Sequence, residues 1–138
     1  MRLELTRRAD YAVRAMLALA RTEGGLLSGP AIASTTASPR GFVTQVMGDL
    51  VDAGLVEART GRHGGYRLCR PPSEITILDV VEAIEGDARR RTCVLRGSPC
   101  LLDGQCDVHA IFSAAQDALL ERLAAASLTS AIAGGPKY

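Results

Sequence analysis

The chain has no long uninterrupted hydrophobic run and no low-complexity stretch. The first absence argues against a membrane-spanning protein, and the second argues for a globular one. Its 138 residues, 47% of them apolar, suffice for one globular domain. The first helical segment is interrupted by Arg7, Arg8, Asp10 and Arg14, so it is neither a secretory signal peptide nor a membrane span. We therefore expect a cytoplasmic protein that does not associate with a membrane.

Lysine is almost absent as well. Fifteen of the sixteen basic residues are arginine, and Lys137 is the one lysine. The planar guanidinium group of arginine suits phosphate and guanine. Residues 1–70 hold ten arginines against six acidic residues, a net charge of +4, whereas residues 71–138 hold six basic and nine acidic residues, a net charge of −3. The first half is therefore where a nucleic-acid-binding surface is expected.

Two arrangements that are common in enzymes are missing, a serine–histidine–aspartate constellation and a glycine-rich phosphate loop. A cysteine nucleophile with His63 or His109 as its base is the enzymatic alternative. The residue types alone are its only support, so the chain is not expected to be an enzyme.

What the sequence does contain is a group of thiols and one imidazole in the run TCVLRGSPCLLDGQCDVH, namely Cys93, Cys100, Cys106 and His109. Glycine, serine, proline and aspartate between them predict a loop. Clustered thiolates favour zinc, copper(I) or an iron–sulfur cluster, with imidazole as an acceptable fourth ligand. Zinc sites usually show closer cysteine pairs, so these wider spacings favour an iron–sulfur cluster. A disulfide with a spare thiol, or three small core residues, is the alternative.

The first half of the chain has the pattern of a helix-turn-helix. Apolar residues at helical spacing predict a helix at the N-terminus. Ser28 followed by Pro30 predicts a second, short helix, and Ser38 followed by Pro39 predicts a third with Ser38 as its N-cap. One face of this third helix is apolar, with Val43, Val46, Met47, Leu50 and Val51. Two short helices joined by the tight turn TTASP indicate a helix-turn-helix.

A predicted β-hairpin follows the third helix. Residues 55–59 and 66–69 alternate in the manner of strands, and three glycines and two potential cations lie between them. A hairpin at this place is the wing of a winged helix. A capping-box pattern, Thr76 with Asp79, then predicts a further amphipathic helix.

The end of the chain is predicted to be one long helix from about Cys106 to Ala126. Its apolar stripe contains Val108, Ile111, Phe112, Ala115, Leu119 and Leu123. Such a stripe on a terminal helix predicts a dimer interface, with packing against its own domain as the alternative. The expected fold is mainly α with a small β-hairpin wing. It divides into a winged helix-turn-helix DNA-binding domain at 1–86, a cysteine-rich cluster-binding loop at 87–106, and a dimerisation helix and tail at 107–138.

Together these motifs resemble the Rrf-type winged-helix transcriptional regulators, whose iron–sulfur members include IscR, NsrR and RirA. The resemblance covers nearly the whole chain and is carried by MRLELTRRADYAVRAML, SPRGFVTQVMGDLVDAGLV, TGRHGGYRL, ITILDVVEAIEG and the cysteine loop. GGYRL in a wing together with the three-cysteine loop is the specific combination. The resemblance implies a homodimer that binds a partly palindromic double-stranded DNA operator. It also implies that an iron–sulfur cluster modulates this binding in response to redox state, nitric oxide or iron.

The resemblance further implies a set of iron ligands. Cys93, Cys100 and Cys106 match the three ligating cysteines of the family. In IscR-like members a histidine three residues after the last cysteine completes a 2Fe–2S site, and His109 stands at that position. In NsrR-like members an aspartate of the partner's first helix ligates a 4Fe–4S cluster, and Asp10 stands there. Because CDVHAIF is closer to the IscR pattern, we favour His109 and a 2Fe–2S cluster, with Asp10 as the alternative fourth ligand.

The candidate DNA-binding residues lie in the third helix and the wing. Arginine pairs with guanine, glutamine pairs with adenine and threonine can touch a thymine methyl group, while arginine can also simply contact a phosphate. A wing arginine is expected along the DNA backbone or in the minor groove. The predicted DNA-binding set is Ser38, Arg40, Thr44, Gln45, Arg59, Arg62 and His63.

The fourth cysteine, Cys69, ends the second strand of the predicted wing. A free cysteine is most often a small buried apolar residue, and we expect this of Cys69. The alternative function for the whole chain is a regulator of the same fold without a cluster, which works as a thiol switch or responds to a small molecule.

Overall fold

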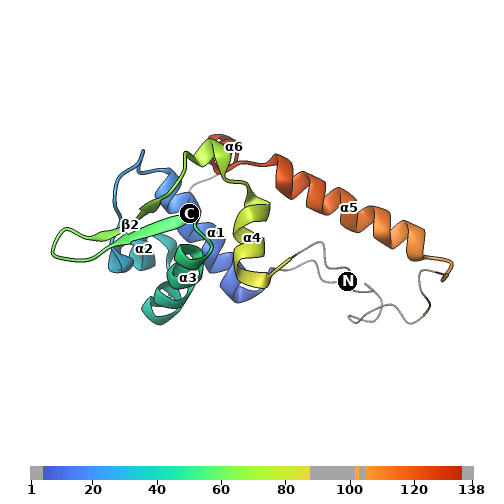
Figure 1. Cartoon of the computed structure of the whole chain (residues 1–138), viewed down its shortest axis with the longest axis horizontal. Helices are drawn as coiled ribbons and strands as arrows, with labels where there is room; N and C mark the ends of the chain where they lie inside the picture. The colour runs from blue at the N-terminus through green and yellow to red at the C-terminus, as the bar shows by residue number, and fades with distance from the viewer. Residues whose placement is uncertain (1–4, 88–101, 103–104, 135–138) are drawn as a thin grey trace.

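The described part of the chain is a group of short helices with a hairpin at one end and a long helix at the other (Figure 1). The computed structural model describes residues 5–87, 102 and 105–134. Its elements are α1 (Arg7–Ala20), α2 (Gly29–Thr36), α3 (Arg40–Asp52), β1 (Val56–Arg59), β2 (Gly65–Leu68), a 3₁₀ turn η1 (Pro72–Glu74), α4 (Ile77–Glu85), α5 (His109–Ala125) and α6 (Leu128–Gly134). The mainly helical fold with a small β-hairpin wing is confirmed.

Side-chain caps start two of the first three helices. Thr6 precedes α1, and its Oγ1 accepts a hydrogen bond from the Ala9 N–H at 3.2 Å. Ser28 caps α2 as predicted, and its Oγ accepts from the Ala31 N–H at 3.2 Å. Each cap satisfies a backbone donor that the first helical turn leaves without a partner.

The predicted Ser38 cap of α3 is wrong. Pro39 occupies the N-cap position with extended dihedral angles, and no side chain caps α3. The Ser38 hydroxyl instead lies in the turn before the helix, buried, with its Oγ 2.8 Å from Oγ1 of Thr36. The Ser38 hydroxyl thus pairs with the Thr36 hydroxyl instead of capping the backbone N–H groups of α3.

The core forms around α1, which α2, α3, α4 and α6 all contact. Residues buried on α1 include Ala9, Ala12, Ala15, Met16, Leu17 and Leu19. The apolar face of α3 packs against them as predicted, with Val43, Val46, Met47 and Leu50 buried. Tyr11 of α1 and Phe42 of α3 add an aromatic contact at the edge of this interface, with ring centroids 5.3 Å apart. The inward face of α3 is thus fixed, and its other face is left for solvent or a partner.

The wing is a two-stranded antiparallel hairpin that pairs Val56 with Leu68. An isolated bridge joins it to the body, where the N–H groups of Leu27 and Tyr66 each donate to the carbonyl of the other, at 3.0 and 2.8 Å. Gly65 makes this approach possible, because a Cβ at that position would lie 2.5 Å from the Leu27 oxygen. This glycine therefore serves the attachment of the wing to the body.

The C-terminal tail departs from the sequence prediction. The capping box of α4 is present, with hydrogen bonds of 2.8 and 3.0 Å between Thr76 and Asp79. After α5, however, the chain returns to the body: the Leu128 N–H donates to the Ile75 oxygen at 2.9 Å, and Leu128 is fully buried. The tail that we grouped with the dimerisation helix therefore completes the core of the winged helix as α6.

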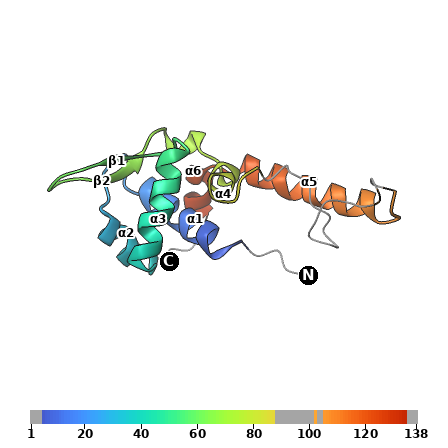
Figure 2. The ribbon, with the colours of Figure 1, turned by 60° about the horizontal axis from the view of Figure 1, so that its bottom comes forward.

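The long helix α5 extends away from the body in both views (Figures 1 and 2). It begins at His109, three residues later than predicted, and none of its residues is buried. Ile111 is 68% exposed and Leu119 is 45% exposed. None of the helices formed by the described residues has the length and hydropathy that crossing a membrane requires.

Candidate DNA interface and cysteine segment

The outward face of α3 presents polar side chains between small residues. Thr44 and Gln45 are both exposed, and the Thr44 hydroxyl donates to the Arg40 carbonyl at 3.1 Å. Gly41 and Gly48 lie on the same exposed side, and a Cβ at either position would meet no other atom within 4 Å. Glycine inside a helix costs about 0.5–1 kcal/mol relative to alanine. Because the two glycines have no side chains, the backbone of α3 can approach a DNA groove closely on either side of Thr44 and Gln45.

Arg40 is exposed at the first residue of α3, at the edge of this face. Ser38, the remaining candidate of this segment, is only 8% exposed, and its hydroxyl is engaged with Thr36. The Ser38 side chain therefore belongs to the turn between α2 and α3 and not to the exposed face of α3.

The wing carries the other candidates. Arg62 and His63 are exposed in the turn between the strands. Arg59 is also exposed, and its Nε lies 3.9 Å from a carboxylate oxygen of Glu57, which also pairs with Arg67 across the hairpin. Figures 1 and 2 show the hairpin extending from the α2 and α3 side of the body, at the opposite end from α5. Three exposed potential cations thus lie on the wing, which extends from the side of the body that α2 and α3 occupy.

One ion pair at the edge of α3 was not predicted. Arg8 of α1 pairs with Asp49 of α3, 41 residues apart in the sequence. Both side chains are partly exposed, at 48% and 34%. A pair between two different helices leaves no local pattern in the sequence, so this contact could be identified only from the structure.

The cysteine segment is described only in its last part. Cys93 and Cys100 lie outside the described residues. Cys106 is a half-buried free thiol, and His109 is exposed at the first residue of α5. The His109 N–H donates to the Cys106 carbonyl at 3.1 Å, which holds the two backbones one turn apart. Within the described ranges, no three histidine, cysteine, aspartate or glutamate side chains come together as a metal site.

The donors that are described suit an iron centre. A cysteine thiolate and a histidine imidazole are both ligands that iron accepts, and both side chains here are at least partly accessible. The alternative ligand Asp10 lies on α1, where its carboxylate accepts from Nε of Arg14 at 3.0 Å. Ligation by Asp10 would therefore compete with this ion pair.

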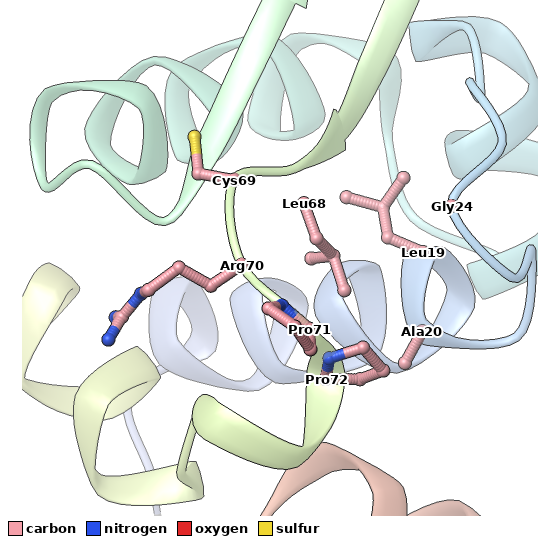
Figure 3. Close-up of a pocket in the computed structure, with 8 residues that line it drawn as sticks. All are labelled: Leu19, Ala20, Gly24, Leu68, Cys69, Arg70, Pro71 and Pro72. Atoms are coloured by element: carbon pink, nitrogen blue, oxygen red, sulfur yellow. The ribbon is translucent and has the colours of Figure 1, made fainter.

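The prediction that Cys69 is buried is wrong. Cys69 is exposed, beside a cavity of about 240 Å³ between the end of α1 and the segment after β2. In Figure 3 the side chains of Leu68 and Leu19 lie together, whereas the Cys69 sulfur points away from them. Side chains alternate along a strand, so with Leu68 directed inward the next side chain is directed outward.

Comparisons with known proteins agree with this architecture. The model of the Rrf2 family, described as an iron-dependent transcriptional regulator, matches residues 5–134. Protein aau3 of Rhizobium meliloti is 33% identical over 136 residues, which cover 98% of this chain and 88% of that protein. The HTH-type transcriptional regulator NsrR of Shouchella clausii is 32% identical over 123 residues, which cover 88% of this chain and 83% of that protein. The structure of CymR, the global cysteine regulator of B. subtilis, is similar with a TM-score of 0.75 at 26% identity, covering 94% of this chain and 95% of that one. The chain therefore belongs to the Rrf2 family of DNA-binding transcriptional regulators and is not an enzyme.

Proposed function

We propose that this protein binds a double-stranded DNA operator as a cytoplasmic homodimer, and that an iron–sulfur cluster modulates the binding in response to redox state, nitric oxide or iron. The observation that carries the DNA-binding part is the division of α3 into two faces. Its apolar face is buried against α1, while Thr44 and Gln45 stand exposed between two glycines. A helix of this kind beside a cationic wing fits the major groove.

The side chains of this surface have separate roles in the proposal. Gln45 reads an adenine edge, and Thr44 contacts a thymine methyl group. Arg40, at the start of α3, contacts guanine or phosphate. Arg62 and His63 at the wing tip follow the DNA backbone or enter the minor groove.

The homodimer is proposed from the state of α5. Seventeen residues of this helix extend from the body without one buried side chain. Ile111 and Leu119, two turns apart, are large exposed apolar residues on it. A second α5 packed against this stripe removes both from water and places two recognition helices in one assembly. A dimer can then read two half-sites about one helical turn of DNA apart.

The cluster is proposed from the donor set and from the family. Cys93, Cys100, Cys106 and His109 would hold it, with Asp10 of the partner as the alternative to His109 and 2Fe–2S favoured over 4Fe–4S. The matched family is described as iron-dependent, which supports iron as the metal. When bound, such a cluster supplies a centre that exchanges electrons and reacts with oxygen or nitric oxide. The protein's part is to tie the residues before α5 to the start of that helix through Cys106 and His109.

Anaerobic purification followed by iron and sulfide analysis tests the cluster. We expect a visible absorption band and roughly one cluster per chain, because thiolates on one loop form a soft donor set. Cys106→Ser should lose the band, whereas Cys69→Ser is the matched control and should keep it. A full cluster in Cys106→Ser would contradict the ligand assignment.

The fourth ligand is tested in the same preparation. We expect His109→Ala to change the absorption spectrum and Asp10→Ala to leave it unchanged. The opposite result would assign the ligand to Asp10 of the partner chain and would favour the 4Fe–4S form.

A thiol switch without a cluster is the second candidate, and the exposure of Cys69 favours it. The similar protein CymR is named as a cysteine regulator, which is compatible with a thiol-based or small-molecule signal. This candidate predicts no iron in anaerobic protein, and it predicts that Cys69→Ser abolishes a change in DNA binding caused by oxidants. The iron-based proposal predicts that Cys69→Ser keeps the response.

A further inference from the structure

The proposed recognition helix carries more negative than positive charge. α3 contains one basic residue, Arg40, and two acidic residues, Asp49 and Asp52, so its net charge is −1. Both carboxylates lie within its last four residues, where the helix dipole disfavours negative charge. DNA phosphates repel them as well. A cation from another element beside α3 would offset this repulsion when the helix docks against DNA.

Arg8 of α1 is a cation that reaches α3. Its Nη2 donates to Oδ2 of Asp49, and 48% of the Arg8 side chain remains exposed. Guanidinium has five N–H donors, so the bond to Asp49 leaves others available. Asp49 lies one helical turn after Gln45, at the border between the buried and exposed faces of α3. The free donors of Arg8 therefore lie along the edge of the face that is proposed to read bases.

The first turn of α1 is held in place on two sides. The Thr6 N–H donates to Oε1 of Glu85 at 3.1 Å, which ties the start of α1 to the end of α4. One turn after Arg8, the ring of Tyr11 packs against Phe42 of α3. The backbone of Arg8 is thus fixed relative to α3, and Asp49 fixes the end of its side chain. A donor that positions a protein on DNA needs such a fixed location.

We infer that Arg8 is a DNA-phosphate-binding residue at the edge of the recognition helix, and that Asp49 is the positioning residue that orients its guanidinium. Its ligand is a backbone phosphate bordering the major groove that α3 enters. The inference rests on the proposed function, because it takes α3 as the recognition helix. In this arrangement the carboxylate of Asp49 aids DNA binding despite its negative charge.

A double-mutant cycle tests this arrangement by comparing Arg8→Ala, Asp49→Asn and the double variant. Affinity is measured for a selected operator and for an unrelated duplex over a range of salt concentrations. Arg8→Ala should weaken binding to both duplexes by about tenfold, the value of one charge-assisted hydrogen bond. It should also make the slope of log K against log salt shallower by about 0.9, as expected for one lost phosphate contact. The ion pair is exposed and contributes little to folding stability, so all three variants should melt like the wild type.

Asp49→Asn gives the deciding result. In the wild-type background it should weaken operator binding, because Arg8 loses its anchor although a negative charge is removed. In the Arg8→Ala background it should strengthen binding, because only repulsion from DNA then remains. A purely structural or purely electrostatic role of Asp49 gives the same sign in both backgrounds. The same sign in both, or an unchanged salt slope in Arg8→Ala, overturns the inference.

Arg7→Ala is the matched control, since it removes the same charge from the neighbouring residue of α1 without touching the pair. Asp49→Asn should keep its wild-type sign in the Arg7→Ala background, and a reversed sign there would also overturn the inference. Gln45→Ala distinguishes failure of the Arg8 inference from failure of the proposed function. If Gln45→Ala changes operator preference and Arg8→Ala has no effect, only this inference fails. If Gln45→Ala and Arg62→Ala both have no effect, the proposed docking of α3 and the wing is wrong and the proposed function fails first.

Discussion

At the scale of single residues, the proposed DNA surface combines two kinds of contact. Gln45 stands on the exposed face of α3, where its amide can match the edge of one base. Arg62 stands at the tip of the wing, where a cation meets the phosphate backbone of any sequence. Specificity and general affinity are therefore assigned to different side chains, and they can be separated by substitution.

Gln45→Ala and Arg62→Ala should change DNA binding in different ways. Gln45→Ala should cost roughly 1–3 kcal/mol at particular operator positions and relax the preference there. Arg62→Ala should weaken binding to all sequences alike and reduce the salt slope by about one unit. Titration of a selected operator, its single-base variants and an unrelated duplex measures both effects. If neither variant binds DNA differently from the wild type, the proposed docking of α3 and the wing is wrong.

At this scale some of the predictions from the sequence are confirmed and others are wrong. The caps at Ser28 and Thr76 join residues three apart, and both were predicted correctly. The cap at Ser38 failed because its hydroxyl pairs with Thr36 in the turn. The burial of Cys69 failed because it depends on which face of the wing strand meets the body, and composition does not contain that information.

At the scale of elements, α5 and α6 differ in burial although both belong to the C-terminal part of the chain. α5 has no buried residue, whereas Leu128 at the start of α6 is fully buried against the winged-helix body. Continuous apolar periodicity concealed the break between them. The signal for α6 is Ser127, whose Oγ accepts from the Ser130 N–H at 3.0 Å in the manner of a capping serine.

Substitutions in the two helices should therefore have contrasting effects. Leu128→Ala should destabilise the folded body by roughly 2–5 kcal/mol, because it opens a cavity in a closed core. Ile111→Asp should leave the stability of the body nearly unchanged and dissociate the proposed dimer, since this side chain is 68% exposed in the single chain. Urea unfolding and sedimentation equilibrium measure the two quantities. A dimer that survives both Ile111→Asp and Leu119→Asp would place its interface on another element.

At the scale of the whole molecule, the wing and the long helix α5 lie at opposite ends of the described structure, and α3, the proposed recognition helix, lies on the side of the wing (Figures 1 and 2). α4 connects α3 with α5, since it contacts α1 and α3 on one side and α5 on the other. Glu85, at the end of α4, also accepts from the Thr6 N–H at the start of α1. A change in α5 can therefore reach α3, the proposed recognition helix, through α4. The winged helix was predictable from its local patterns, whereas this connection depends on contacts between distant segments.

The central claim, that cluster state controls operator binding, is tested most directly by one comparison. The affinity of cluster-loaded and cluster-free protein for the same selected operator is measured under anaerobic conditions. Both forms should be folded dimers, because the core of the winged helix includes no residue of the cysteine segment among its described members. Their affinities should differ by about 1–3 kcal/mol, the usual size of an allosteric coupling, for at least one operator. Equal affinities for every selected operator would contradict the account and leave the cluster with a purely structural role.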